Sequence, residues 1–228
     1  MLKSFLILII INTFLYSNNQ IILVVSADFD SPEATLSSFE NNKKVFQDFK
    51  VNIGKNGLGW GIGKTALTKE KNEPLKYEGD KKAPLGIFTL SHVFGYKNKI
   101  KINMPYLHAT KELICVDDSN SKYYNKIINI QEEKPNSFEY MRRDDLQYEL
   151  GIIVEHNKNQ KKKRGSCIFL HVEKSKGSST AGCTSMNYDN MKKLVEWLDE
   201  SKNPTLIQIT KSQLDQVYKL YPKLKYAK

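Results

Sequence analysis

The chain has 228 residues, of which 40% are hydrophobic and 11% aromatic, and its formal net charge is +10 at pH 7. This composition excludes a disordered chain, and the length suits one sizeable domain rather than two. The charge favours a partner that is negatively charged: nucleic acid, an anionic lipid surface or a bacterial cell wall. The lysine-rich run 158–164 contains no aromatic residue for stacking on a base, so we interpret it as a solvated loop between two strands.

The first residues have the layout of a signal peptide. Lys3 precedes an apolar run over 5–11, which resumes at 14–16 and ends in small and polar residues. We therefore predict a signal peptide over 1–17 and a single mature domain over 18–228.

An uncleaved membrane anchor is the alternative, because residues 21–25 are apolar again after a short polar break. The apolar core is shorter than the ~20 residues that a spanning helix needs, which favours cleavage without stable membrane insertion. We expect the protein in the periplasm or outside the cell, and export disfavours nucleic acid as a partner.

The chain contains three cysteines, Cys115, Cys167 and Cys183. An odd number in an exported chain means at least one free thiol or an intermolecular bond. If Cys115 and Cys167 pair, Cys183 is left alone. The sequence has no CxxC, HExxH or similar spacing of metal ligands, so we expect neither a metal site nor a cofactor.

The first half of the mature chain reads as strands around a glycine cluster. Residues 20–26 predict a buried strand, and 35–49 carry a loose helical pattern. Glycines then alternate over 57–63 and end in a Gly-Lys-Thr sequence, the tail of a phosphate-binding loop. Leu58 stands where that loop requires a glycine, so we expect no nucleotide site and interpret the glycines as points of close backbone approach.

The second half predicts an alternation of short strands and helices. Two strands end near a histidine, at His156 and at His171, whereas His92 and His108 read as surface or packing residues. Residues 77–88 predict a turn followed by a strand, and 112–116 form a short apolar run. The other expected strands are 150–155, 167–171 and 205–210, and the expected helices are 137–146, 188–200 and 212–220.

The strand at 167–171 and the loop after it suggest a nucleophile and its base. Side chains alternate across a sheet, so Cys167, Phe169 and His171 share one face and His171 lies at the rim. The loop returns as Gly182-Cys183 just before the helix, whose N-terminus would stabilise a thiolate. The alternative is a buried structural thiol beside a strand-end histidine, and spacing alone leaves both interpretations open.

Several motifs of the mature chain resemble the L,D-transpeptidase catalytic domain (YkuD type) of bacterial cell-wall enzymes. The core of that family's pattern is a histidine, a variable loop and Ser/Thr-x-Gly-Cys, which His171 and residues 180–183 reproduce. Further matches cover nearly the whole mature chain: GKNGLGWG, the EGD segment at 78–88, VDDS at 116–119 with Tyr124-Asn125, and the strand GSCIFLH.

The resemblance implies the fold and the roles of the catalytic residues. The expected fold is mainly β with flanking helices (α+β), a single-domain β-sandwich with the site in a groove. Cys183 would be the nucleophile, His171 the base oriented by a backbone carbonyl, and the N–H groups of Gly182 and Cys183 the oxyanion donors.

Two positions depart from the family's commonest form. The residue before Gly182 is often histidine, and here it is Ala181. The residue two after the cysteine is often Arg or Asn, and here it is Ser185. With Thr180, these positions shape the expected donor site. His156 and Asn157, which follow the neighbouring strand, are a further candidate substrate-binding pair, with a strand-end hydrogen-bonding role as the alternative.

The resemblance implies acyl transfer on peptidoglycan stem peptides. Cys183 would attack the carbonyl between an L-configured centre, typically of diaminopimelate, and D-alanine, and release D-alanine from a thioester. A stem amine would resolve the thioester into a cross-link or an attached protein, and water would make the enzyme an L,D-carboxypeptidase. A non-enzymatic wall-binding module is a further alternative, given the charge and the departures at Ala181 and Ser185. The sequence does not indicate the oligomeric state.

Overall fold

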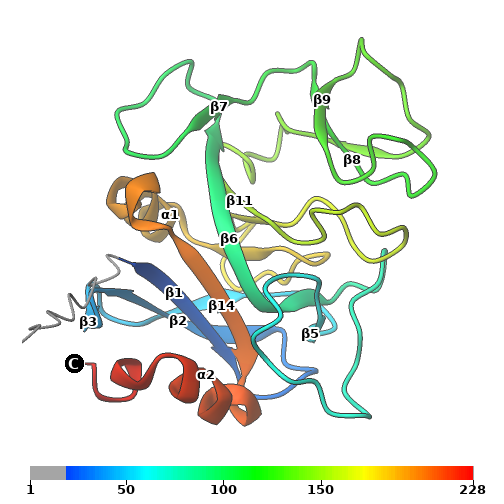
Figure 1. Cartoon of the computed structure of the whole chain (residues 1–228). Coiled ribbons are helices and arrows are strands. Elements are labelled where there is room, and N and C mark those ends of the chain that lie inside the picture. The colour runs from blue at the N-terminus through cyan, green and yellow to red at the C-terminus, as the bar shows by residue number, and fades with distance from the viewer. Residues whose placement is uncertain (1–18, 228) are drawn as a thin grey trace, which may run out of the picture.

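A sheet that closes on itself forms the centre of the fold. The computed structural model describes residues 19–227, so the predicted signal peptide at 1–17 lies outside the described residues. Around the ring, each strand is hydrogen-bonded to the next. The order is β1 (Gln20–Ser26), β14 (Thr205–Thr210), β6 (Ala83–Gly95), β11 (Leu150–Val154), β12 (Phe169–Val172), β13 (Thr184–Met186), β4 (Phe49–Asn52) and β2 (Glu33–Glu40). Figure 1 shows β2, β1, β14, β6 and β11 of this ring side by side.

The closure corrects the expected sandwich. Strand β1 pairs with β14 in parallel and with β2 in antiparallel register, so the first and last strands of the order are neighbours and the sheet becomes barrel-like. The expectation of a mainly β chain with few helices in one domain is confirmed. Short strands extend the ring at β3 (Lys43–Lys44), β5 (Leu58–Trp60) and β7 (Tyr106–His108).

A second, smaller sheet lies above one end of β6 (Figure 1). Its three strands are β8 (Leu113–Val116), β9 (Ile127–Asn129) and β10 (Phe138–Tyr140), in the order β10-β8-β9. A disulfide between Cys115 and Cys167 ties this sheet to the chain just before β12, which leaves Cys183 as a free cysteine.

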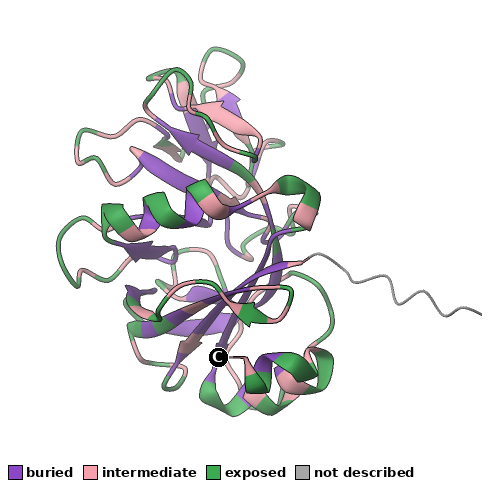
Figure 2. Cartoon of the chain, turned by 90° about the vertical axis from the view of Figure 1, so that its left-hand side faces the viewer, coloured by how far each residue is buried: buried purple, intermediate pink, exposed green. Residues whose placement is uncertain are grey.

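The helices cover the outside of the ring. Helix α1 (Tyr188–Trp197) begins at an Asn187 cap, buries Met191, Leu194 and Val195, and packs on β11 and β12. Its inner face is buried and its outer face exposed (Figure 2). Helix α2 (Leu214–Leu220) follows β14, and the short turns η1 (Glu200–Lys202), η2 (Lys211–Gln213) and η3 (Pro222–Tyr226) complete this half. No helix in residues 19–227 is long and apolar enough to cross a membrane.

Two predicted helices are wrong. Residues 35–49 form most of β2 and the start of β4, because β2 pairs along its length with β1 and buries alternate side chains such as Ala34 and Leu36. Residues 137–146 contain β10, which pairs with β8, and then turns. In both segments long-range strand pairing overrides a weak local pattern.

The alternating glycines permit close backbone approach, as the sequence predicted. A Cβ on Gly63 would lie 2.4 Å from the carbonyl oxygen of Ile87, and one on Gly57, whose φ is +74°, would lie 2.1 Å from that of Phe29. Lys64 donates its backbone N–H to the Ile87 oxygen over 2.8 Å. The Gly-Lys-Thr sequence therefore packs against β6.

Candidate active site

Strand β12 sorts its side chains onto two faces of the ring. It lies between β11 and β13, with His171 opposite Gly151 on one side and Ser185 on the other. Ile168 and Leu170 belong to the main core, whereas Cys167, Phe169 and Cys183 share a second apolar cluster. The predicted alternation is confirmed, although the strand begins only at Phe169.

His171 is held in one tautomer by its own strand. The side chain is 3% exposed, and its Nδ1 lies 2.7 Å from the carbonyl oxygen of Val172. Because a carbonyl oxygen only accepts, Nδ1 carries the proton, and Nε2 of the neutral ring is left to accept one. Burial lowers the pKa of His171 to about 4, so the ring is neutral at pH 7.

The thiol of Cys183 contacts the backbone of the segment that leads to His171. The backbone N–H of Phe169 donates to Sγ over 3.3 Å, and Sγ lies 3.4 Å from the carbonyl oxygen of Cys167. Burial raises the pKa of the Cys183 thiol to about 12, and the nearby carboxylate of Glu139 adds to the rise. At rest the site therefore holds a neutral thiol and a neutral imidazole, not an ion pair.

The predicted position of Cys183 at a helix N-terminus is wrong. Strand β13 follows the cysteine directly, and α1 begins only at Tyr188. The helix dipole acts within about one turn, so α1 begins too far from Cys183 to stabilise a thiolate. The backbone N–H of Phe169, which donates to Sγ, is the group that can do so.

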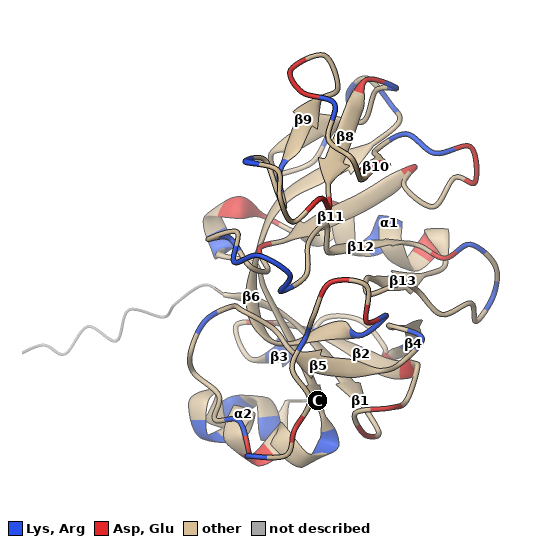
Figure 3. Cartoon of the chain, turned by 90° about the vertical axis from the view of Figure 1, so that its right-hand side faces the viewer, with Lys and Arg blue, Asp and Glu red and all other residues tan. Residues whose placement is uncertain are grey.

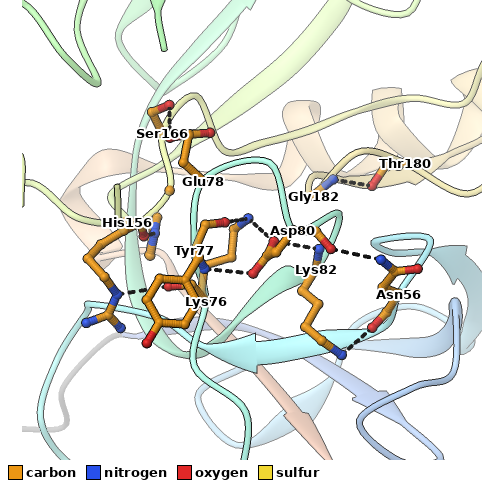
Figure 4. A network of polar contacts seen from close by, with 12 residues as sticks. Asn56, Lys76, Tyr77, Glu78, Asp80, Lys82, His156, Ser166, Thr180 and Gly182 are labelled. Atoms are coloured by element: carbon orange, nitrogen blue, oxygen red, sulfur yellow. Dashed lines mark hydrogen bonds and ion pairs between the residues drawn. The ribbon is translucent and has the colours of Figure 1, made fainter. Parts of the chain in front are cut away.

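The loop before Cys183 is folded by Thr180. Its hydroxyl donates to the carbonyl oxygen of Cys183 over 2.7 Å and accepts from the N–H of Gly182 over 3.1 Å (Figure 4). Gly182 has a φ of +150°, and a Cβ there would lie 3.1 Å from the Lys82 carbonyl oxygen, which favours glycine. One of the two expected oxyanion donors, the Gly182 N–H, is thus already bonded to a side chain.

Cys183 and His171 line one pocket of about 390 Å³, together with Thr180, Ala181 and Gly182. The structure thus brings together five of the predicted site residues. Charged side chains complete the lining: Lys76, Glu78, Asp117, Glu139 and Arg143.

The charged wall is cross-linked by hydrogen bonds. The Tyr148 hydroxyl donates to Glu139 over 2.5 Å, and its ring forms a T-shaped pair with the His171 ring, with the ring centroids 5.3 Å apart. Arg143 forms a bidentate pair with Asp145, over 2.9 and 2.7 Å. The Oδ1 atom of Asp117 is buried and has no hydrogen-bond partner within the described part of the chain.

The EGD segment and the chain just before it contribute Lys76, Glu78 and Gly79 to the pocket lining, and Figure 4 shows the contacts of Lys76 and its neighbours. Lys76, only 2% exposed, pairs with Asp80 over 2.5 Å, and Asp80 also accepts the backbone N–H groups of Tyr77 and Lys82. Glu78 accepts hydrogen bonds from the hydroxyls of Ser166, over 2.7 Å, and Tyr124. Residues of the EGD and VDDS motifs, of the GSCIFLH strand and of the motif at 180–183 therefore meet at the pocket.

Three predicted substrate-binding residues lie away from the pocket lining. Ser185 is 1% exposed inside β13, between β12 and β4, and its hydroxyl has no partner among the described residues. The His156 ring accepts the Ile62 N–H at Nδ1 and donates from Nε2 to the Arg164 oxygen. Asn157 bonds the backbone of the loop that follows it. The contacts of His156 and Asn157 fit the alternative hydrogen-bonding role at the strand end, and substrate binding by the three residues stays a prediction.

Other residues that line the pocket with Cys183 and His171, in β10 of the second sheet and in the turns after it, were not predicted from the sequence. Glu139, Arg143 and Tyr148 lie in or beside the segment that was predicted to be a helix, and nothing in their spacing marked them. Glu78 and Asp117 stood in family-like motifs, which was the signal that could have identified them. Among residues 19–227, no group of His, Cys, Asp and Glu side chains is placed to hold a metal ion.

Comparison with known families accounts for this arrangement. The family model of the L,D-transpeptidase catalytic domain (YkuD) matches residues 22–209, which include both Cys183 and His171. No curated protein and no solved structure matches the chain. The match covers most of the chain, from β1 to β14, and the chain belongs to the L,D-transpeptidase catalytic-domain family of enzymes that act on peptidoglycan.

Proposed function

We propose that the protein is a cysteine-dependent L,D-transpeptidase that cleaves tetrapeptide stems of peptidoglycan through a thioester on Cys183. The observation that carries the proposal is the pairing of a free thiol and a histidine of fixed tautomer in one pocket of a YkuD-family domain. No member of this arrangement requires a cofactor.

In the first step the thiol proton moves to Nε2 of His171. Sγ then forms a bond to the carbonyl carbon of the L-configured residue that precedes D-alanine. His171 returns the proton to the departing amine as the carbon–nitrogen bond breaks, so that D-alanine leaves and a thioester remains. The Nδ1 bond to Val172 keeps the ring in the orientation that both transfers need.

In the second step the amine of another stem attacks the thioester. Nε2 of His171 takes the amine proton, a new amide forms, and the sulfur leaves as the thiolate, which the imidazolium reprotonates. If water attacks, the same site works as an L,D-carboxypeptidase.

The developing oxyanion needs donors close to the sulfur. We assign this role first to the N–H of Cys183, and to that of Gly182 once the Thr180 hydroxyl releases it. A requirement for this release would make Thr180 a residue that senses the bound substrate.

We also propose that the protein works in the periplasm or outside the cell. Residues 1–17, with one lysine and an apolar run, support this location, as does a substrate that lies beyond the membrane.

The test is incubation of purified protein with tetrapeptide-rich sacculi, followed by mass spectrometry of the products. Release of D-alanine with new 3-3 cross-links supports transpeptidation, and release with tripeptide stems alone supports hydrolysis. An unchanged muropeptide profile, equal to that of the matched Cys183→Ala variant, would leave only a wall-binding module and overturn the proposal.

A further inference from the structure

The loop between β11 and β12 carries a dense group of exposed cations. We call residues 158–164 the lysine loop. Lys158, Lys161, Lys162 and Lys163 are all exposed, and Figure 3 colours the lysines and arginines of the chain blue. Within residues 19–227, only Lys158 of these four has an acidic partner, Glu155 at 3.6 Å. The positive charge of the loop is therefore almost uncompensated.

Two buried polar side chains fix the backbone of this loop. Asn157, fully buried, donates from Nδ2 to the carbonyl oxygens of Lys161 and Gly165, and its Oδ1 accepts the Lys161 N–H. His156, 2% exposed, donates to the Arg164 oxygen over 2.9 Å. A loop held in this way presents its lysines in one arrangement, so less backbone entropy is lost when they bind.

The lysine loop is joined to the wall of the pocket. The Glu78 N–H donates to the carbonyl oxygen of Lys163 over 3.0 Å, and Nε of Arg164 donates to that of Lys76 over 2.9 Å. Ser166, two residues after the loop, lines the pocket beside Cys183. The lysine loop is therefore bonded directly to residues that line the pocket.

We propose that the lysine loop is a docking surface for the carboxylate-bearing stem peptides of intact peptidoglycan, next to the stem that reacts at Cys183. This inference rests on the proposed function. Stem peptides repeat along each glycan strand and carry carboxylates, so several weak lysine–carboxylate contacts add up on the polymer but not on one free stem. The loop thus favours wall-bound over soluble substrate.

The test compares two variants that each lose four positive charges. The loop variant carries Lys158→Gln, Lys161→Gln, Lys162→Gln and Lys163→Gln, which leave the backbone bonds of the loop in place. The control carries Lys192→Gln, Lys193→Gln, Lys211→Gln and Lys219→Gln, four exposed lysines in or beside α1 and α2. Both are made in the Cys183→Ala background and cosedimented with intact sacculi at low and high salt.

We expect the loop variant to bind sacculi about tenfold more weakly at low salt, with little remaining salt dependence, and the control to bind like its parent. Equal losses in both variants would show a general charge effect and overturn the proposal. Unchanged binding of the loop variant would overturn it as well. Capture by phosphatidylglycerol vesicles in place of sacculi would assign the loop to a lipid surface.

An activity arm separates this proposal from the proposed function. In the Cys183 background, the loop variant should keep the parent's rate on soluble tetrapeptide and show a raised KM with unchanged kcat on sacculi. Equal KM values on sacculi for the loop variant and the parent would contradict docking. Absence of D-alanine release by the parent from both substrates would refute the proposed chemistry, whereas sedimentation would still decide the role of the loop.

Discussion

Two histidines at the ends of neighbouring strands have different tasks. His156 follows β11 and His171 lies in β12. Both are almost fully buried, and burial lowers the pKa of each to about 4. The His156 ring uses both nitrogens, with Ile62 and Arg164, whereas the His171 ring uses only Nδ1 in the described part of the chain.

The difference shows that burial and a lowered pKa do not by themselves mark a catalytic histidine. A base needs one ring nitrogen without a protein partner, facing a pocket that a substrate can enter. His171 lines the Cys183 pocket and His156 does not. In the sequence both residues stand at the end of a predicted strand. Only their hydrogen-bond partners in the structure distinguish the two roles.

The largest effect on activity is expected at Cys183, the proposed nucleophile. Cys183→Ala should lower D-alanine release from tetrapeptide stems by about 10⁴-fold or more, because no other group can form the thioester. Release is measured by mass spectrometry of stem peptides, with circular dichroism as the check on folding. A folded variant with most of the parent's rate would remove Cys183 from the mechanism.

Substitution of each histidine tests directly whether His171 acts in catalysis and His156 in stability. His171→Asn should lower kcat by about 10²- to 10⁴-fold, because proton transfer is lost. His156→Gln should lower the free energy of unfolding by about 1–3 kcal/mol, because it removes two buried hydrogen bonds, and should leave kcat near the parent's. Steady-state kinetics and urea unfolding of both variants measure this. A large loss of kcat in a stable His156→Gln protein would reverse the assignment.

The pH dependence of stability should come from both histidines. Each has a folded-state pKa of about 4 against the ordinary 6.5, so below pH 6.5 the unfolded chain binds protons that the folded chain does not. The free energy of unfolding therefore keeps its full value above pH 6.5 and falls towards pH 4. Each histidine contributes about 1.4 kcal/mol to this fall for every pH unit. Urea unfolding between pH 7.5 and 4.5 measures the slope, which His156→Gln should reduce. A slope that is unchanged in this variant would contradict a buried neutral His156.

The smallest effect is on the acid limb of activity. In the proposed mechanism the neutral His171 ring is the base, and its lowered pKa should place the fall of kcat/KM near pH 4, so that at pH 5.5 most of the activity at pH 7 is retained. The dependence of kcat/KM on pH is measured from initial rates in buffers of constant ionic strength. A half-maximal rate near pH 6.5 would show that the ring titrates as if exposed.

How much could be predicted depended on whether a feature was local. The strands at 20–26, 150–155 and 205–210 and the helix after Asn187 carry strong local patterns, and the structure has them. The ring closure depends on pairing between β1 and β2, and the helical pattern at 35–49 gave no sign of it. Pairings of this kind are set by the whole chain.

In the candidate site too, residues in local patterns could be predicted and residues brought in by long-range contacts could not. Strand alternation and the motif at 180–183 identified His171 and Cys183, which lie at the pocket. Glu139 and Arg143 could not be predicted, because they reach the pocket through a second sheet and the turns after it. The Cys115–Cys167 disulfide, left open by the sequence, ties that sheet to the chain before β12.

The most direct test of the account is the intact mass of the protein shortly after mixing with tetrapeptide stem. We expect an adduct with the mass of the stem minus D-alanine on the parent, located on Cys183 after proteolysis. We expect the same adduct on His156→Gln, a much slower one on His171→Asn and none on Cys183→Ala. D-alanine release without any covalent adduct, or an adduct on another residue, would contradict a thioester mechanism at Cys183.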